Sequence, residues 1–178
     1  MTPGSATLEN LDRLIEQVKD PYLLIEATCD MADHVAQSIR QARGDFLPFP
    51  EAEKILGVTR SWLRGEIAVG AAWGEATSHT YKNLDTADRR AEMAHYKAAS
   101  QLTRMLEAVV NGQQYQAQRL VRHAAADCRR AIIQTRHNIR VRRDEDEWQI
   151  AYMEALCRLR SSSIPEGRLR NSLLANRQ

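Results

Sequence analysis

Apolar residues recur at alternating spacings of three and four along the first part of the chain, which is the period of one face of an α-helix. The stripe consists of Leu8, Leu11, Ile15, Val18, Tyr22, Ile25, Cys29, Ala32, Ala36 and Ile39. Asp20-Pro21 interrupts it with an N-cap residue followed by a proline at the first helical position. The pattern predicts two helices, over about 8–19 and 21–43, and Gly44 marks the end of the second.

Residues 87–143 show the same periodicity in two longer stretches, separated by the helix stop Asn111-Gly112. The apolar face of the first, over about 87–110, carries Ala91, Ala94, Ala98, Leu102, Met105 and Val109. The face of the second, over about 114–143, carries Val121, Ala125, Cys128, Ile132, Thr135 and Ile139. Asp85-Thr86 is expected to cap the first helix. Together the two stretches predict a long antiparallel helical hairpin.

The remaining segments contain more breaks. Two prolines close the stretch 44–50, and residues 51–84 suggest two or three short helices punctuated by glycines. An acidic run, 144–147, follows a basic one, and this charge order favours a helix junction or kink near Arg143. The expected apolar face of the last helix carries Trp148, Tyr152, Ala155 and Leu159.

These elements predict an all-α protein, a helical bundle built on the long antiparallel hairpin with an N-terminal helical arm. We divide the chain into an acidic arm (1–44), a short-helix region (45–84), the hairpin and following helix (85–160) and a basic tail (161–178). Only 6% of the 178 residues are aromatic, and there are eight glycines and five prolines. Strand formers and turn residues are therefore too few for a β-sandwich or barrel.

Charge is unevenly distributed although its net value is only +2. Residues 1–50 carry four basic and eight acidic side chains, whereas residues 51–178 carry 21 basic and 15 acidic ones. Arginine outnumbers lysine 21 to four. Arginine suits phosphate and carboxylate binding because its guanidinium is a planar fork of donors. A GC-rich genome would give the same arginine bias without any function.

The sequence contains no motif of catalysis or cofactor binding. It has no G-x-S-x-G, no P-loop and no dinucleotide fingerprint. Cys29, Cys128 and Cys157 lie far apart and on apolar stripes, so they fit small core residues better than zinc ligands or nucleophiles. We therefore expect neither a cofactor nor enzymatic activity.

A metal site is also considered. Glu92-x-x-His95 has the spacing found in di-iron helical bundles, but such sites need a second motif of the same kind, and the chain has one. An acidic helical stripe is formed by Glu26, Asp30, Asp33 and His34. Solvated helix faces explain both patterns better, so no metal is expected.

The N-terminal residues do not resemble a secretory leader, because Met1 to Leu14 contains Glu9 and Asp12 and no apolar run. The longest weakly apolar run, Ile67 to Gly74, is too short to span a bilayer. An odd cysteine count suits a reducing compartment. We expect a protein of the bacterial cytoplasm, or of a virion if its role is structural, with no membrane partner.

The most specific local pattern lies over residues 50–67. Leu56-Gly57-Val58 followed by Thr59-Arg60-Ser61, with Ala52, Leu63 and Ile67, resembles the helix-turn-helix of excisionase-like bacterial DNA-binding proteins. The resemblance implies a tight turn at Gly57 and a second helix capped by Thr59. Arg60, Ser61 and Arg64 would then face the major groove, and Trp62 would stand on the outer side as an interface anchor.

The chain departs from that pattern at three points. Glu53 occupies a position where a small apolar residue is usual, Gly65 lies inside the expected recognition helix, and no β-wing follows. The alternative interpretation is two short helices that turn inside a bundle.

A second basic feature is the predicted helix 119–143, which carries eight arginines and one acid, Asp127. One stripe consists of Arg122, Arg129, Arg136, Arg140 and Arg143, at spacings of seven, seven, four and three. The stripe would follow phosphates without reading bases. Alternatively, it would pair with the acids of residues 1–50 in a neighbouring subunit.

Two functions remain open. The first is an oligomeric, DNA-binding phage or mobile-element protein of packaging or regulatory type, whose layout is similar to that of phage small terminase subunits. The second is a ring-forming structural virion protein, such as a head–tail connector or head-completion protein, which the stretches 94–99 and 128–132 weakly resemble. Such a protein would contact other phage assembly proteins. The orientation of Arg60 and Arg64 discriminates between the two, because base-reading residues must be exposed.

Overall fold

The computed structural model describes residues 3–80, 84, 89–135 and 139–161, and every regular element within them is helical. This confirms the predicted all-α bundle. The elements are α1 (Pro3–Gln17), α2 (Pro21–Ala42), α3 (Pro50–Leu63), α4 (Val69–His79), α5 (Arg90–Val110), the 3-10 turn η1 (Gln114–Gln116), α6 (Ala117–Thr135) and α7 (Ile139–Ser161).

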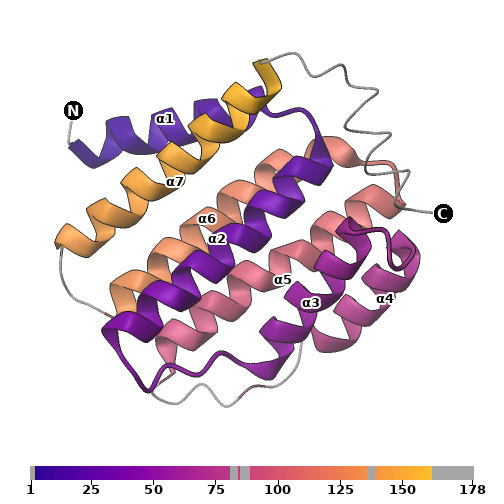
Figure 1. Cartoon of the computed structure of the whole chain (residues 1–178), viewed down its shortest axis with the longest axis horizontal. Coiled ribbons are helices and arrows are strands. Elements are labelled where there is room, and N and C mark those ends of the chain that lie inside the picture. Colours follow the sequence, from indigo (N-terminus) through magenta and orange to yellow (C-terminus); the bar gives the residue numbers. More distant parts are fainter. Residues whose placement is uncertain (1–2, 81–83, 85–88, 136–138, 162–178) are drawn as a thin grey trace.

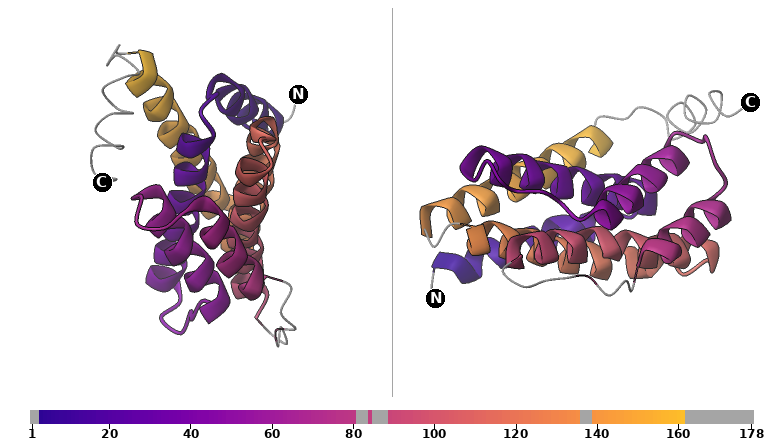
Figure 2. Two further views of the ribbon diagram at one scale, coloured as in Figure 1. Left: turned by 90° about the vertical axis from the view of Figure 1, so that its right-hand side faces the viewer. Right: turned by 90° about the horizontal axis from the view of Figure 1, so that it is seen from below.

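The long hairpin predicted from the sequence is formed by α5 and α6, which pack against each other along their length. Helix α2 packs against both (Figure 1). On one side α3 and α4 cover α5, and on the other α1 and α7 lie together next to α6 (Figure 2). The predicted acidic arm, 1–44, therefore does not stand apart, because its helix α2 packs against both α5 and α6.

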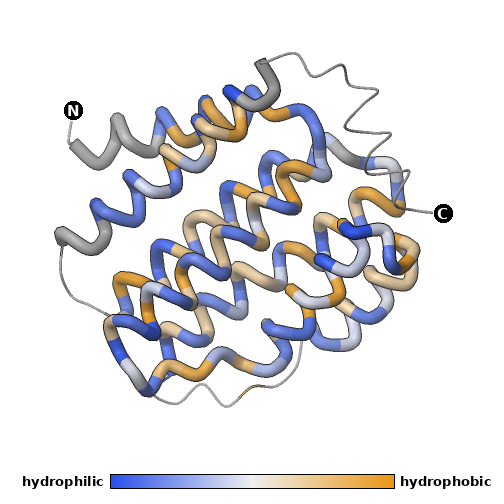
Figure 3. The backbone as a smooth tube through the Cα atoms, viewed as in Figure 1, coloured by the Kyte–Doolittle hydropathy of each residue, from blue (hydrophilic) through white to orange (hydrophobic). Residues whose placement is uncertain are grey.

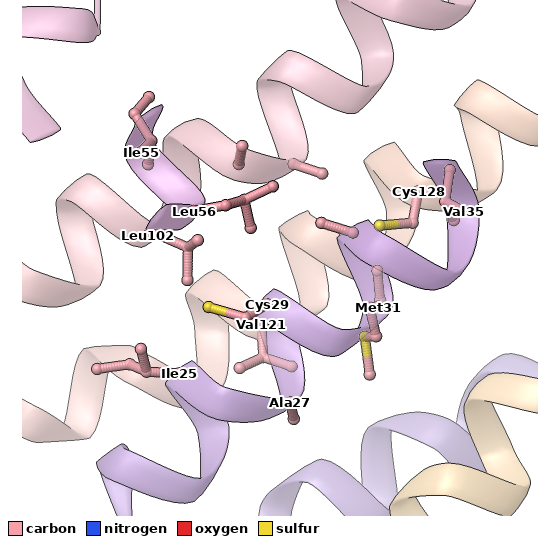
Figure 4. Packing of buried hydrophobic residues seen from close by; sticks show 14 of the residues in the cluster. Ile25, Ala27, Cys29, Met31, Val35, Ile55, Leu56, Leu102, Val121 and Cys128 are labelled. Atoms are coloured by element: carbon pink, nitrogen blue, oxygen red, sulfur yellow. The ribbon is translucent and has the colours of Figure 1, made fainter. Parts of the chain in front are cut away.

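The core is built where α2, α5 and α6 meet. Along the tube of Figure 3, hydrophobic positions recur at helical spacing, interrupted by hydrophilic ones. In Figure 4, Ile25 and Cys29 of α2 lie close to Leu102 of α5 and Val121 of α6, and all four are fully buried. Fully burying side chains of this size contributes about 1.5–3 kcal/mol each.

The predicted apolar stripes account for much of this core. Nearly all described members of the N-terminal stripe are buried, and Tyr22 is partly buried. In α5 the alanines at 91, 94, 98 and 99 are buried, and such small residues let helices approach closely. The pattern missed the second buried side of α2, which includes Leu24, Met31 and Val35. A helix with neighbours on several sides has no single apolar face.

Two helix boundaries are also confirmed. The Asp20 carboxylate accepts the amide N–H of Tyr22 at 2.8 Å and caps α2. Gly112 ends α5 at φ 69°, and the Gln113 amide donates to the Ala108 carbonyl at 2.7 Å. This pair of features is the Schellman helix ending that Asn111-Gly112 suggested.

The junction predicted near Arg143 is wrong. Helix α6 already ends at Thr135, and α7 runs without interruption from Ile139 through the acidic run 144–147. Tertiary partners hold two acids of this run inside the bundle, because Glu145 pairs with His34 and Asp146 with Arg129. The buried face of α7 consequently contains Gln149 and Met153 as well, while Ala155 is exposed. The basic tail and the Asp85-Thr86 cap lie outside the described residues.

The turn expected at Gly57 is not formed. Helix α3 continues through Gly57, and the chain turns instead at Gly65, which has φ 76°. There the Gly65 amide donates to the Trp62 carbonyl at 2.8 Å and the Glu66 amide to the Ser61 carbonyl at 2.9 Å. This Schellman ending connects α3 to α4. The glycine taken as a departure from the motif is therefore the residue that makes the turn.

Exchanging each glycine for alanine tests this assignment. We expect Gly65→Ala to lower the free energy of unfolding by about 1 kcal/mol, because a Cβ disfavours the left-handed conformation. We expect Gly57→Ala to raise it by about 0.8 kcal/mol, since Gly57 is helical, exposed and free of neighbours within 4 Å of an added Cβ. Urea unfolding of the two variants measures both effects, and reversed signs would place the turn at Gly57.

Candidate nucleic-acid interface

Two residues of the expected recognition helix, Thr59 and Trp62, are buried in the bundle. Thr59 is fully buried, and its hydroxyl donates to the Ile55 carbonyl at 2.7 Å within α3. Trp62, expected as an exposed anchor, is 5% exposed and stacks on Tyr22 with ring centroids 5.0 Å apart. Both expectations are wrong because α3 is one helix, and the face that the motif would expose packs against the bundle.

Arg60 is engaged by the acidic residues of α2. Its guanidinium donates to the Asp33 carboxylate at 2.5 Å and lies 3.7 Å from Asp30. Asp30 in turn accepts a hydrogen bond from the Tyr152 hydroxyl at 2.6 Å. This network joins α3, α2 and α7, so Arg60 acts in the structure as an ion-pair partner within the chain.

Arg64 and Ser61 are the expected recognition residues that approach the surface together. Arg64 is exposed, but it is paired with Glu66 at 2.5 Å and donates to the Ser61 hydroxyl at 3.2 Å. The hydrogen bond from Arg64 lowers the pKa of Glu66 to about 2. The Arg64 charge is thus balanced locally across the α3–α4 turn.

The arginine stripe predicted on residues 122–143 is divided among separate ion pairs. Arg122 contacts Asp12 at 3.1 Å and Glu16 at 2.6 Å in α1, and exposed Arg143 pairs with Glu147 at 2.8 Å. Arg129 is buried with Asp146. Arg136 and the side chain of Arg140 lie outside the described residues. Acids of the first 50 residues do pair with arginines of the second part, and these pairs lie within one chain.

A basic surface that sequence reasoning missed lies on the outer side of the hairpin. We call it the basic face and define it as Arg90, Lys97 and Arg104 of α5 with Arg119, His123 and Arg130 of α6; all six are exposed. The α5 members are spaced by seven residues on the side away from the alanine stripe. That spacing of seven residues is the sequence signal for this surface, and it is weaker than the dense run of arginines over 119–143.

The cations of the basic face have few ion-pair partners among the described residues. Within the described residues, no carboxylate forms an ion pair with Arg90, Lys97, Arg104 or Arg119. Arg130 pairs at 3.0 Å with Asp127, which is 6% exposed. Burial raises the pKa of Asp127, against the opposing effects of Arg130 and Lys97. Exposed Glu107 is a further acid on α5.

The sequence predicted that Glu92 and His95 lie on a solvated helix face, and this prediction is wrong. Both side chains are buried, at 2% and 1% exposure, and Arg43 pairs with Glu92 at 2.6 Å. In the part of the chain that the structure describes, no three histidine, cysteine or acidic side chains are grouped so that they could hold a metal ion.

His34, Ser38 and Glu145 form a second polar group that the sequence did not reveal. The Ser38 hydroxyl and the Glu145 carboxylate lie 3.5 and 3.3 Å from the same atom, His34 Nε2. The His34 ring is stacked on Trp148, with centroids 3.7 Å apart. A charge-relay triad needs the acid and the hydroxyl on opposite ring nitrogens, so this geometry is that of a structural cluster.

Comparison with protein-family models, curated proteins and solved structures found no match. None of the helices in the described residues has the length and apolarity needed to cross a membrane.

Proposed function

We propose that the protein is a non-enzymatic, helical DNA-binding component that contacts the nucleic-acid backbone through the basic face. The observation that supports this proposal is the contrast between two sets of cations. The described arginines predicted to contact DNA have carboxylate partners, whereas Arg90, Lys97, Arg104 and Arg119 are exposed and have none among the described residues. The phage or mobile-element context rests on the layout resemblance alone.

Backbone contact suits this surface better than base reading. Residues seven apart on a helix are separated by about 10.5 Å, so the cations of α5 form a line that can follow successive phosphates. Such contacts give affinity and strong salt dependence without sequence preference. Base reading needs a helix whose exposed side chains enter the groove, whereas Thr59 and Trp62 are buried and Arg60 is held by Asp33.

A charge-matched pair of triple variants tests the proposal. We expect Arg90→Gln/Lys97→Gln/Arg104→Gln to weaken binding of labelled duplex DNA by about 10- to 100-fold in fluorescence anisotropy, because three phosphate contacts are lost. The control, Lys54→Gln/Arg64→Gln/Arg143→Gln, removes the same charge from exposed positions elsewhere and should bind almost as wild type. Equal losses in both variants would indicate attraction by net charge only, and a loss confined to the control would contradict the proposal.

Head-to-tail self-association is a second candidate, favoured by large apolar side chains exposed at the two ends of α5. Arg89, at the N-terminal end, donates to the Leu47 carbonyl at 2.6 Å, and the Leu47 side chain is 70% exposed. Just beyond the C-terminal end, Tyr115 is 75% exposed. Different patches at opposite ends suit a heterologous contact, the kind that generates rings.

Light scattering after size-exclusion chromatography measures this association. We expect wild type to be larger than a monomer and Tyr115→Ser or Leu47→Ser to shift it towards monomer, because each removes one side of the contact. Glu75→Ser, at an exposed position of α4, is the control and should leave the size unchanged. A wild-type protein that is monomeric at high concentration would contradict this candidate.

A further inference from the structure

An acidic side chain lies among the cations of the basic face. Asp127 of α6 is only 6% exposed, and Arg130, whose side chain is 68% exposed, donates to its carboxylate at 3.0 Å. Lys97 of α5 is close enough to act on the same charge. This carboxylate therefore offsets part of the positive charge of the surface that we propose to contact DNA, and it holds Arg130 in place.

The surroundings of Asp127 leave room for a neutral carboxyl. Burial raises its pKa above the ordinary value, although Arg130, Lys97 and a hydrogen bond with the Gln101 side chain favour the charged form. Gln101 is itself incompletely paired, because its buried Oε1 has no hydrogen-bond partner among the described residues. An amide and a carboxylic acid can exchange two hydrogen bonds, since the protonated carboxyl has a hydroxyl to donate. Protonation of Asp127 thus supplies the donor that Gln101 lacks.

The charged groups of the other helices packed on α6 have partners elsewhere. At about 100° per residue, Arg122 and Arg129 lie on the opposite side of α6 from Asp127. The pairs formed with these helices are Arg122 with Asp12 and Glu16 of α1, Arg129 with Asp146 of α7, and His34 of α2 with Glu145 of α7. The charges that act on the Asp127 carboxyl are consequently those of Arg130 and Lys97.

Phosphates that contact the basic face change the balance at Asp127. A phosphate bound by Arg130 or Lys97 competes with the Asp127 carboxylate for these cations and also repels it. The buried carboxylate then has less compensation for its charge, which favours the neutral acid. Because thermodynamic coupling is reciprocal, proton uptake by Asp127 must in turn strengthen phosphate binding.

We propose that Asp127 makes the basic face sensitive to pH: its carboxylate holds Arg130 when DNA is absent, and it takes up a proton from solvent when phosphates bind Arg130 and Lys97. The proposal rests on the proposed DNA binding and assigns a regulation to that same surface. Its consequence is that DNA affinity rises as the pH falls.

Binding of labelled duplex DNA between pH 8 and pH 5, at one fixed salt concentration, tests the proposal. All proteins carry His123→Gln, because exposed His123 is the other group of the basic face that titrates in this range. We compare this protein with His123→Gln/Asp127→Asn, in which the asparagine imitates the neutral acid. The double variant should bind at least about threefold more tightly at pH 8, and its affinity should rise at least about threefold less towards pH 5, since one linked proton changes the association constant by up to tenfold per pH unit.

A second acid of the hairpin provides the matched control. Glu107→Gln removes an exposed negative charge from α5 and should keep the pH dependence, because Asp127 is still present. Asparagine has nearly the size of aspartate, and the Arg130 side chain that it releases is exposed, so Asp127→Asn should stay folded. A wild-type protein that fails to bind DNA at low salt would overturn both the proposed function and this proposal. DNA binding whose pH dependence persists in Asp127→Asn, or is lost equally in Glu107→Gln, would overturn this proposal alone.

Discussion

Lowering the pH from 6.5 to 4 is expected to lower the free energy of unfolding by about 3 kcal/mol through His95 alone. Burial lowers the pKa of this ring from its ordinary 6.5 to about 4. Well above pH 6.5 the ring is neutral in both the folded and the unfolded chain, so it does not affect stability there. Between the two values the unfolded chain binds a proton that the folded chain excludes, and the loss is complete below about pH 4.

Urea unfolding at several pH values between 7 and 4 measures this contribution. The carboxylates titrate in the same range, so the comparison is between wild type and His95→Leu, in which only the buried ring is missing. The variant should lose about 3 kcal/mol less than wild type over the interval. Exposed His123→Gln is the control and should follow wild type. Parallel curves for wild type and His95→Leu would show that His95 titrates normally.

Breaking the buried ion pair between α6 and α7 is expected to have an effect of similar size. Arg129 Nη2 donates to Asp146 at 3.1 Å and its Nε lies in ion-pair contact with the same carboxylate, while the two side chains are only 10% and 11% exposed. Asp146→Ala leaves a buried guanidinium without its partner, which should lower the free energy of unfolding by about 3–5 kcal/mol. Arg143→Gln breaks an exposed pair and should lower it by less than about 1 kcal/mol.

The double variant Arg129→Met/Asp146→Leu separates the value of the pair from the penalty of an unpaired charge. Because apolar groups can replace a buried pair with little loss, we expect it to be more stable than Asp146→Ala. Chemical denaturation of all four proteins measures the comparison. If Asp146→Ala cost no more than Arg143→Gln, the packing of α7 on α6 described above would be wrong.

Helix class and most boundaries could be predicted from the sequence because they depend on local signals. Asp20-Pro21 and Asn111-Gly112 determine capping within a few residues, and the stripe through Ile25 and Cys29 follows from helical period. The helix junction predicted at the acidic run 144–147 was wrong because the order of charges there was interpreted as a helix end. Asp146 is instead neutralised by Arg129, 17 residues earlier, and helical periodicity does not encode such a contact.

The candidate nucleic-acid interface was harder to predict because side-chain exposure and ion pairing depend on the tertiary structure. Arg60 had the right sequence context for DNA recognition, yet Asp33, 27 residues away, binds it. Conversely, Arg90, Lys97 and Arg104 form no dense cluster in the sequence. Only the folded chain shows that these three side chains have no ion-pair partner among the described residues. The sequence could not show which of Gly57 and Gly65 forms the turn, because any glycine can adopt a positive φ.

The salt dependence of duplex DNA binding tests the central claim most directly. If the basic face contacts phosphates, a plot of the logarithm of the association constant against that of the salt concentration falls steeply, and the slope decreases by roughly two to three in the Arg90→Gln/Lys97→Gln/Arg104→Gln variant. The charge-matched variant at Lys54, Arg64 and Arg143 should keep the wild-type slope. A wild-type slope near zero, or the same slope in all three proteins, would contradict backbone binding by the hairpin.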